Sequence, residues 1–199
     1  MNDKKSYEQV LEEGQKKAQE FLEGYGLGGA VLTEQFEFRE IRSEEAEQAV
    51  QIEQICLPPN EACTEKMMLE RVAAIPELFL VAADRETGKI AGLINGLATD
   101  RESLQDDFFR DASLHNPQGR NVMILGVEVL PEYQGKGIAK ELMYQYLRKE
   151  QERGRKMVVL TCLESKIKMY EKMGFRNLGI AQSVWGGEQW YEMSCVLNI

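Results

Sequence analysis

The sequence has few of the residues from which metal and nucleophilic sites are usually built. It contains one histidine, His115, and four cysteines, and no two of the cysteines have Cys-x-x-Cys spacing. A zinc site with four protein ligands is therefore not expected, and no metal is predicted. We interpret the cysteines as reduced thiols of a cytoplasmic protein, and His115 as a structural residue.

Long apolar stretches are absent as well. No apolar run approaches the roughly 20 residues that cross a membrane, and residues 1–17 do not resemble a signal peptide, so no membrane partner is expected. The formal net charge of −9 argues against a nucleic-acid partner. A cationic substrate such as an amine would suit this charge, although solubility alone also explains it.

The chain does have the 43% hydrophobic content of a globular protein, and its 199 residues suffice for one domain. Hydrophobic periodicity predicts an α/β protein with helices over residues 4–25, 43–57, 64–74, 103–112, 136–153 and 167–173. Ser43 is the predicted N-cap of the second helix. The predicted strands are 36–41, 78–83, 90–98, 121–130 and 157–163, with a tight hairpin at 182–191 around Gly186-Gly187.

The chain divides into two parts on this pattern. Residues 1–35 form an N-terminal amphipathic helix with a glycine-rich connection, and residues 36–199 form the domain. The helix would cover the surface of the domain or dock on a second subunit, in which case the protein is a homodimer.

The most informative segment runs from Val122 to Ala139. An apolar run over 122–130 predicts a buried strand, and a turn with Gly135 and Gly137 connects it to an amphipathic helix. Because these residues have little side-chain bulk, the N–H groups of the turn can converge on one point. The helix N-terminus adds its partial positive charge there, which predicts an anion site suited to a pyrophosphate.

Two common anion motifs do not fit this turn. A P-loop needs Lys after its second glycine, where this chain has Ile138, and the dinucleotide fingerprint needs a third small residue, where it has Lys140. The pattern Gln-x-x-Gly-x-Ala at 134–139 resembles the acetyl-coenzyme A loop of the GNAT superfamily of N-acetyltransferases. The resemblance implies acetyl-CoA as co-substrate, bound by Val127, Glu128, Val129, Gln134, Gly135, Lys136, Gly137, Ile138, Ala139 and Lys140.

A second segment agrees with this resemblance. Residues 169–175 resemble the superfamily's Tyr-x-x-x-Gly-Phe pattern, which implies that Tyr170 lies near the sulfur of the cofactor; a packing tyrosine is the alternative. Further matches, at 76–78, 102–104, 114–119 and 192–193, resemble the arylalkylamine (serotonin-type) N-acetyltransferase branch. Over residues 36–198 the resemblance implies the GNAT acyltransferase fold, a mixed and largely antiparallel twisted sheet flanked by helices, here with an extra N-terminal helix.

The general base of the reaction is not where the branch resemblance would place it. The vertebrate members carry two histidines on the strand before the anion loop, and this chain has Met123 and Leu125 at those positions. Insect members carry a glutamate where this chain has Glu61, which makes Glu61 a candidate base, although it could equally be a solvated loop residue. Glu128 and Glu164 are lesser candidates.

The resulting functional hypothesis is transfer of acetyl from acetyl-CoA to a primary amine on a small molecule, such as an arylalkylamine or a polyamine. The acceptor would lie between residues 57–64 and 183–190, with Trp185 and Trp190 in its walls. A protein or peptide N-acetyltransferase and a non-catalytic acyl-CoA-binding regulatory module are the alternatives.

Overall fold

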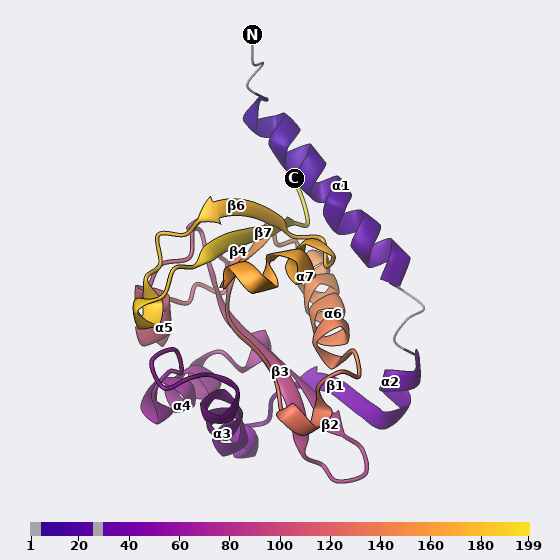
Figure 1. Ribbon diagram of the computed structural model, residues 1–199, viewed down its shortest axis with the longest axis vertical. Helices are drawn as coiled ribbons and strands as arrows, with labels where there is room; N and C mark the ends of the chain where they lie inside the picture. The colour runs from indigo at the N-terminus through magenta and orange to yellow at the C-terminus, as the bar shows by residue number, and fades with distance from the viewer. Residues whose placement is uncertain (1–4, 26–29) are drawn as a thin grey trace.

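A computed structural model describes residues 5–25 and 30–199 of the chain. Within these residues a seven-stranded sheet has the order β1-β2-β3-β4-β5-β7-β6 (Figure 1). Its strands are β1 (Phe36–Glu40), β2 (Phe79–Asp84), β3 (Ile90–Thr99), β4 (Asn121–Val129), β5 (Met157–Cys162), β6 (Arg176–Ile180) and β7 (Tyr191–Val196). The pair β4–β5 is parallel and the other pairs are antiparallel. The predicted mixed, largely antiparallel sheet is confirmed.

The helices cover both faces of this sheet. They are α1 (Tyr7–Tyr25), α2 (Ala30–Gln35), α3 (Ala46–Cys56), α4 (Glu65–Ala74), α5 (Asp107–Arg110), α6 (Ile138–Glu152) and α7 (Ile167–Glu171). The pair α3 and α4 packs through one hydrophobic cluster, and α1, α6 and α7 pack through the other. Among the described residues, no helix is long and apolar enough to cross a bilayer.

The N-terminal helix α1 lies along β7 and α6, as its amphipathic pattern predicts. Ala18, Phe21 and Leu22 are buried in the main core, and a Cβ added at Gly174 would lie 3.0 Å from the Cα of Ala18. The expectation that this helix covers the surface of the domain is confirmed. Gly26, Gly28 and Gly29 of the predicted connection lie outside the described residues.

Three local predictions are corrected. A short helix, α2, follows the connection and was not predicted. Ser43 does not cap α3, because residues Ser43–Glu45 form a 3₁₀ turn in which the Glu45 carboxylate accepts a hydrogen bond from the Arg42 backbone N–H at 2.9 Å. Helix α6 starts at Ile138 rather than at 136, because Gly137 has a left-handed φ of 87°.

The tight hairpin around Gly186-Gly187 is also wrong. The two strands that pair are β6 and β7, and residues 181–190 form a loop whose last ladder bond runs from Ala181 N–H to Trp190 O. The side chain of Trp185 stacks on Phe109 at 4.7 Å between ring centroids instead of pairing across a hairpin. Both stacked residues line the cavity of the site described next.

Candidate active site

Strands β4 and β5 separate part-way along their length. They pair only from Asn121 to Met123, opposite Met157 to Val159. Beyond that point they line two sides of a cavity of about 480 Å³. A bulge in β4 accompanies the separation, since Gly96 pairs with Ile124 and Asn95 pairs with Gly126, which leaves Leu125 as the extra residue.

The separation leaves backbone groups of β4 directed into the gap. Leu130 N–H donates to Ala91 O of β3. Along an antiparallel strand, successive residues direct their backbone groups alternately toward the partner strand and away from it. The backbone groups of Val129 therefore point away from β3. Its carbonyl accepts instead from Gln134 Nε2 at 3.0 Å and from Cys56 Sγ at 3.4 Å. By the same alternation Val127 also faces the gap, whereas the backbone of Glu128 faces β3.

The glycine turn between β4 and α6 lies at one end of the cavity. Gly135 and Gly137 have φ values of 78° and 87°, a conformation that favours glycine. Residues 134–137 are exposed, and among the described atoms none lies within 4 Å of a Cβ added at Gly135. The backbone N–H groups of the turn and of the first turn of α6 are therefore accessible to an anion.

The predicted cofactor residues do not all line this cavity. Val127, Glu128, Val129, Gln134, Gly135 and Ala139 do. Lys136 lies over the Tyr133 ring, Lys140 lies over the Tyr25 ring, and the Ile138 side chain is buried in the core. Ile138 and Gly137 can thus offer only backbone groups to an anion, while the two lysines lie beside the loop.

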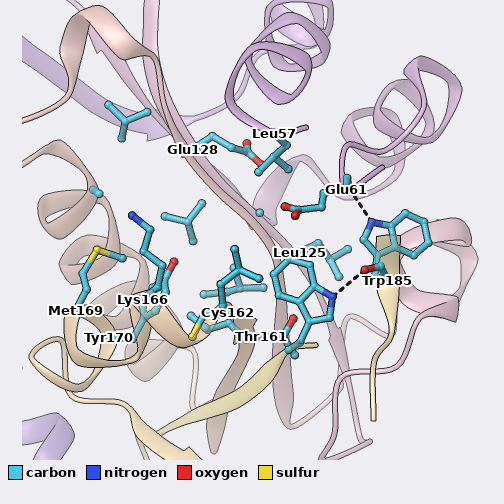
Figure 2. Close-up of a pocket in the computed structure, with 18 of the residues that line it drawn as sticks. Leu57, Glu61, Leu125, Glu128, Thr161, Cys162, Lys166, Met169, Tyr170 and Trp185 are labelled. Carbon is cyan, nitrogen blue, oxygen red and sulfur yellow. Dashed lines mark hydrogen bonds between the residues drawn. The ribbon is translucent and has the colours of Figure 1, made fainter. Parts of the chain in front are cut away.

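Tyr170, Lys166 and Met169 lie together on the side of the cavity opposite Trp185 (Figure 2). Tyr170 is 7% exposed and packs edge-on against Phe175. Burial, with smaller contributions from Cys162 and Glu128, raises the pKa of the Tyr170 hydroxyl. Burial also raises the pKa of Cys162 to about 11. Both groups therefore stay protonated at neutral pH, and Tyr170 is a hydrogen-bond donor.

Glu61 lies at the opposite end, where two loops meet. Trp185 Nε1 donates to the Glu61 carbonyl at 2.7 Å, and Asn60 Nδ2 donates to Gly186 O at 2.9 Å. Trp190 Nε1 donates to Trp185 O at 2.8 Å. Figure 2 shows the Glu61 carboxylate pointing into the cavity. Burial, and secondarily the nearby Glu188, raises the pKa of Glu61.

Sequence reasoning missed several residues of this cavity. Phe109, Thr161 and Lys166 line it and belong to no motif, and Met169 lines it beside the Tyr170 motif without having been given a role. Glu164 and His115 are outside its lining; His115 Nδ1 accepts from Ala98 N–H, as a structural residue would. Within the described ranges no cluster of His, Cys, Asp or Glu could hold a metal ion.

Glu128 lies on the other face of β4 from Val127 and Val129, as strand alternation predicts. It is 2% exposed and packs against Glu53 of α3. Burial and the Glu53 carboxyl raise its pKa well above the ordinary range. The sequence did hint at Glu53, because it lies on the same helix face as Ala49 and Ile52, which are buried.

Comparison with known proteins identifies the family. The model of the Acetyltransferase (GNAT) family matches residues 38–175. The chain belongs to this family. The fold is that of the loading GNATL domain of CurA from Lyngbya majuscula, with a TM-score of 0.69, 16% identity, and coverage of 81% of this chain and 98% of that one.

Two further similarities bear on the site. The yncA protein of Salmonella typhimurium, whose structure contains acetyl-CoA, has a TM-score of 0.58 and 17% identity over 82% of this chain and 95% of that one. Serotonin N-acetyltransferase of Mesocricetus auratus is 30% identical over 116 residues, which are 57% of this chain and 54% of that protein. The match thus spans about half the length of this relative, and it agrees with the predicted branch resemblance.

Proposed function

We propose that this GNAT chain transfers the acetyl group of acetyl-CoA to a primary amine on a small molecule. The observation that carries the proposal is the gap between β4 and β5, which presents backbone groups of Val127 and Val129 beside the glycine turn of α6. An extended pantetheine can pair with these groups like an added strand, and a pyrophosphate can accept from the turn. Acetyl-CoA would supply the acetyl group as an activated thioester.

Two groups of the chain would stabilise negative charge that develops during the reaction. Val127 N–H, directed into the gap, would donate to the thioester oxygen as that oxygen gains negative charge. The Tyr170 hydroxyl would donate to the developing thiolate. Reference pKa values of about 10 for tyrosine and about 8.5 for a thiol make full proton transfer uphill by roughly 2 kcal/mol. The raised pKa of Tyr170 makes it more so, and we assign this residue hydrogen bonding rather than proton donation.

The acceptor amine must lose a proton before it can attack. With a pKa of about 10.4, only on the order of one amine in a thousand is neutral near pH 7. Glu61 is the carboxylate we assign to this step. Its side chain points into the cavity, and its raised pKa brings it closer to the operating pH of a general base.

A small acceptor is favoured by the closure of the acceptor end. The bonds from Trp185 to Glu61 and from Asn60 to Gly186 join the loops that an open peptide groove would separate. The walls there include Leu57, Trp185 and Trp190, which are suited to an apolar or aromatic amine. The name of the serotonin N-acetyltransferase relative agrees with such an acceptor.

The alternatives make different predictions. A protein or peptide N-acetyltransferase would accept a free peptide N-terminus or a lysine side chain better than a small amine. A non-catalytic acyl-CoA-binding module would bind acetyl-CoA and release no thiol.

We also propose a cytoplasmic location, with which the four free cysteines accord. The division at residue 35 and the homodimer stay predictions.

Release of free thiol from acetyl-CoA tests the proposal. The protein is incubated with acetyl-CoA and a panel of arylalkylamines, aliphatic diamines, alkylamines and short peptides. We expect amine-dependent thiol release and an acetylated small amine by mass spectrometry. Release with peptides alone would support the peptide alternative, and binding of acetyl-CoA without release for any amine would support the regulatory module.

A further inference from the structure

The acceptor side of the cavity contains buried carboxyls that the reaction above does not use. Glu128 and Glu53 are 2% and 3% exposed. Among the residues that the structure describes, no donor is bonded to either carboxyl oxygen of Glu128 or to Glu53 Oε2. The two carboxyls can bond to each other only when one of them is protonated. Cys63 N–H donates to the other Glu53 oxygen at 3.0 Å. Glu128 lines the cavity, whereas Glu53 lies behind it and outside the lining. A buried carboxyl without a donor is costly, so the Glu128 carboxyl at the cavity indicates a ligand.

The Glu128 side chain is directed over the cavity floor. A Cβ added at Gly126 would overlap Glu128 Oε1 and would lie 2.8 Å from Asn95 Nδ2. Glu128 and Gly126 both line the cavity. The absence of a side chain at residue 126 thus makes room for the carboxyl at the floor, on the face of β4 that α3 and α4 cover.

Charge balance shows what this floor can accept. The titratable groups facing Glu128 are Glu53 and Cys56 from α3, Arg71 from α4, and Tyr170 across the cavity. Arg71, 2% exposed, donates to Asn95 Oδ1 and Phe109 O, and its charge acts against the rise in the pKa of Glu128. When the two carboxyls share a proton, only one is ionised, and Arg71 balances it. When both are ionised, a second positive charge is needed, and a cation of the ligand can supply it.

The reacting amine and this second cation have separate carboxyls. Glu61 enters the cavity from the loop at its rim, and Glu128 enters from the floor; Figure 2 shows them on two walls with Leu57 beside them. Leu57 beside the two carboxyls is apolar, which suits a methylene chain.

We infer that the acceptor is an amine with a second cationic nitrogen, such as an α,ω-diamine or a longer polyamine. This inference rests on the proposed function. Glu128 binds the second ammonium group, Glu53 adds its charge from behind, and Glu61 faces the amino group that reacts. As this ammonium enters, the proton held by the carboxyl pair leaves to solvent. No covalent bond to carbon changes in this binding step.

Paired ligands test this inference on the unmodified protein. Calorimetry compares α,ω-diamines, from the propane to the hexane chain, with the alkylamine of the same chain, in the presence of CoA. We expect one diamine length to bind about 10- to 150-fold more tightly than its alkylamine, the range for a hydrogen bond to a charged group. Titration in two buffers of different ionisation enthalpy should show release of a proton by the diamine only.

Three variants locate the effect. Glu128→Gln and, separately, Glu53→Gln should remove the preference for the diamine over its alkylamine, together with the proton release. Glu164→Gln is the matched control, because it removes an exposed carboxylate outside the cavity lining. It should retain the preference.

Equal affinity of every diamine and its alkylamine for the wild-type protein would overturn the inference, as would a preference that survives in Glu128→Gln. Equal loss of kcat on both amines in Glu128→Gln would also overturn it, because Glu128 would then act on the reacting nitrogen. The proposed function fails separately, when no amine elicits thiol release, and the binding preference can be measured in either case.

Discussion

One end of the cavity is lined mainly by backbone groups and the other mainly by side chains. The end that we propose binds the cofactor, here the cofactor end, consists largely of backbone: the β4 groups of Val127 and Val129 and the amides of the glycine turn before α6. The acceptor end consists of side chains, among them Glu61, Glu128 and Trp185. Backbone groups keep the same chemistry whatever residues surround them, whereas the acceptor end can change with a few substitutions. A substitution at one end should therefore leave the constants of the other end nearly unchanged.

The largest effect is expected at the acceptor end, in Glu61→Gln. If Glu61 accepts the amine proton, directly or through water, kcat/KM at neutral pH should fall by about 10²- to 10⁴-fold. Because the pKa of Glu61 is raised, wild-type kcat/KM should fall as the pH drops through that value and Glu61 becomes protonated. The deficit of the variant should shrink toward the pKa of the amine, where the acceptor is already neutral.

The pH–rate profiles of Glu61→Gln and wild type decide this point. The affinity for CoA serves as the control, since it belongs to the other end of the cavity and should not change. Profiles that overlay from acid to alkaline pH would make Glu61 a loop residue without a role in proton transfer.

A smaller effect is expected where the two ends meet, in Tyr170→Phe. Loss of a hydrogen bond to a developing thiolate should cost about 1.5–3 kcal/mol, or roughly 10- to 150-fold in kcat. CoA affinity should change little, because the hydroxyl acts on charge that develops during the reaction. An unchanged kcat, measured where chemistry limits the rate, would return Tyr170 to a packing role against Phe175.

The smallest effect is expected in Phe109→Leu, at the wall of the acceptor end. The substitution keeps an apolar side chain and removes the stack on Trp185. Aromatic pairs contribute about 0.5–1.5 kcal/mol beyond area burial, so KM for the amine should rise about 2- to 12-fold. Steady-state kinetics with each substrate varied would check it. A change in KM for acetyl-CoA of the same size would show that the two ends are not separate.

The cofactor end was more predictable from the sequence than the acceptor end. The strand 121–130 and the turn at Gly135 and Gly137 depend on neighbours in the chain, so periodicity and glycine placement indicate them. The acceptor end depends on tertiary contacts between residues 57–64, 103–112 and 181–190. No local pattern predicts that Trp185 stacks on Phe109, and for this reason the tight hairpin was wrong.

Glu53 illustrates an intermediate case. The helix over 43–57 was predicted, and a glutamate on the face that carries Ala49 and Ile52 violates its apolar pattern. The violation was visible in the sequence, but its partner Glu128 lies on β4, and only the packing of α3 on the sheet brings the two together. A pair of buried carboxyls from two distant segments is therefore identified from the structure and not from the sequence.

The division of the cavity is tested most directly by calorimetric titration of CoA into Gly137→Val. Among the described atoms, the added Cβ comes within 4 Å of Leu32 alone, at 3.7 Å, so the described fold has room for it. The branched side chain and its effect on the left-handed backbone should nevertheless obstruct the pyrophosphate. Gly154→Val is the matched control, since Gly154 has a φ of 79° just after the opposite end of α6 and no described atom within 4 Å of an added Cβ. We expect wild type, Gly154→Val and Glu61→Gln to bind CoA alike and folded Gly137→Val to bind about tenfold more weakly or worse. Equal affinity of folded Gly137→Val would contradict the assignment of the cofactor end.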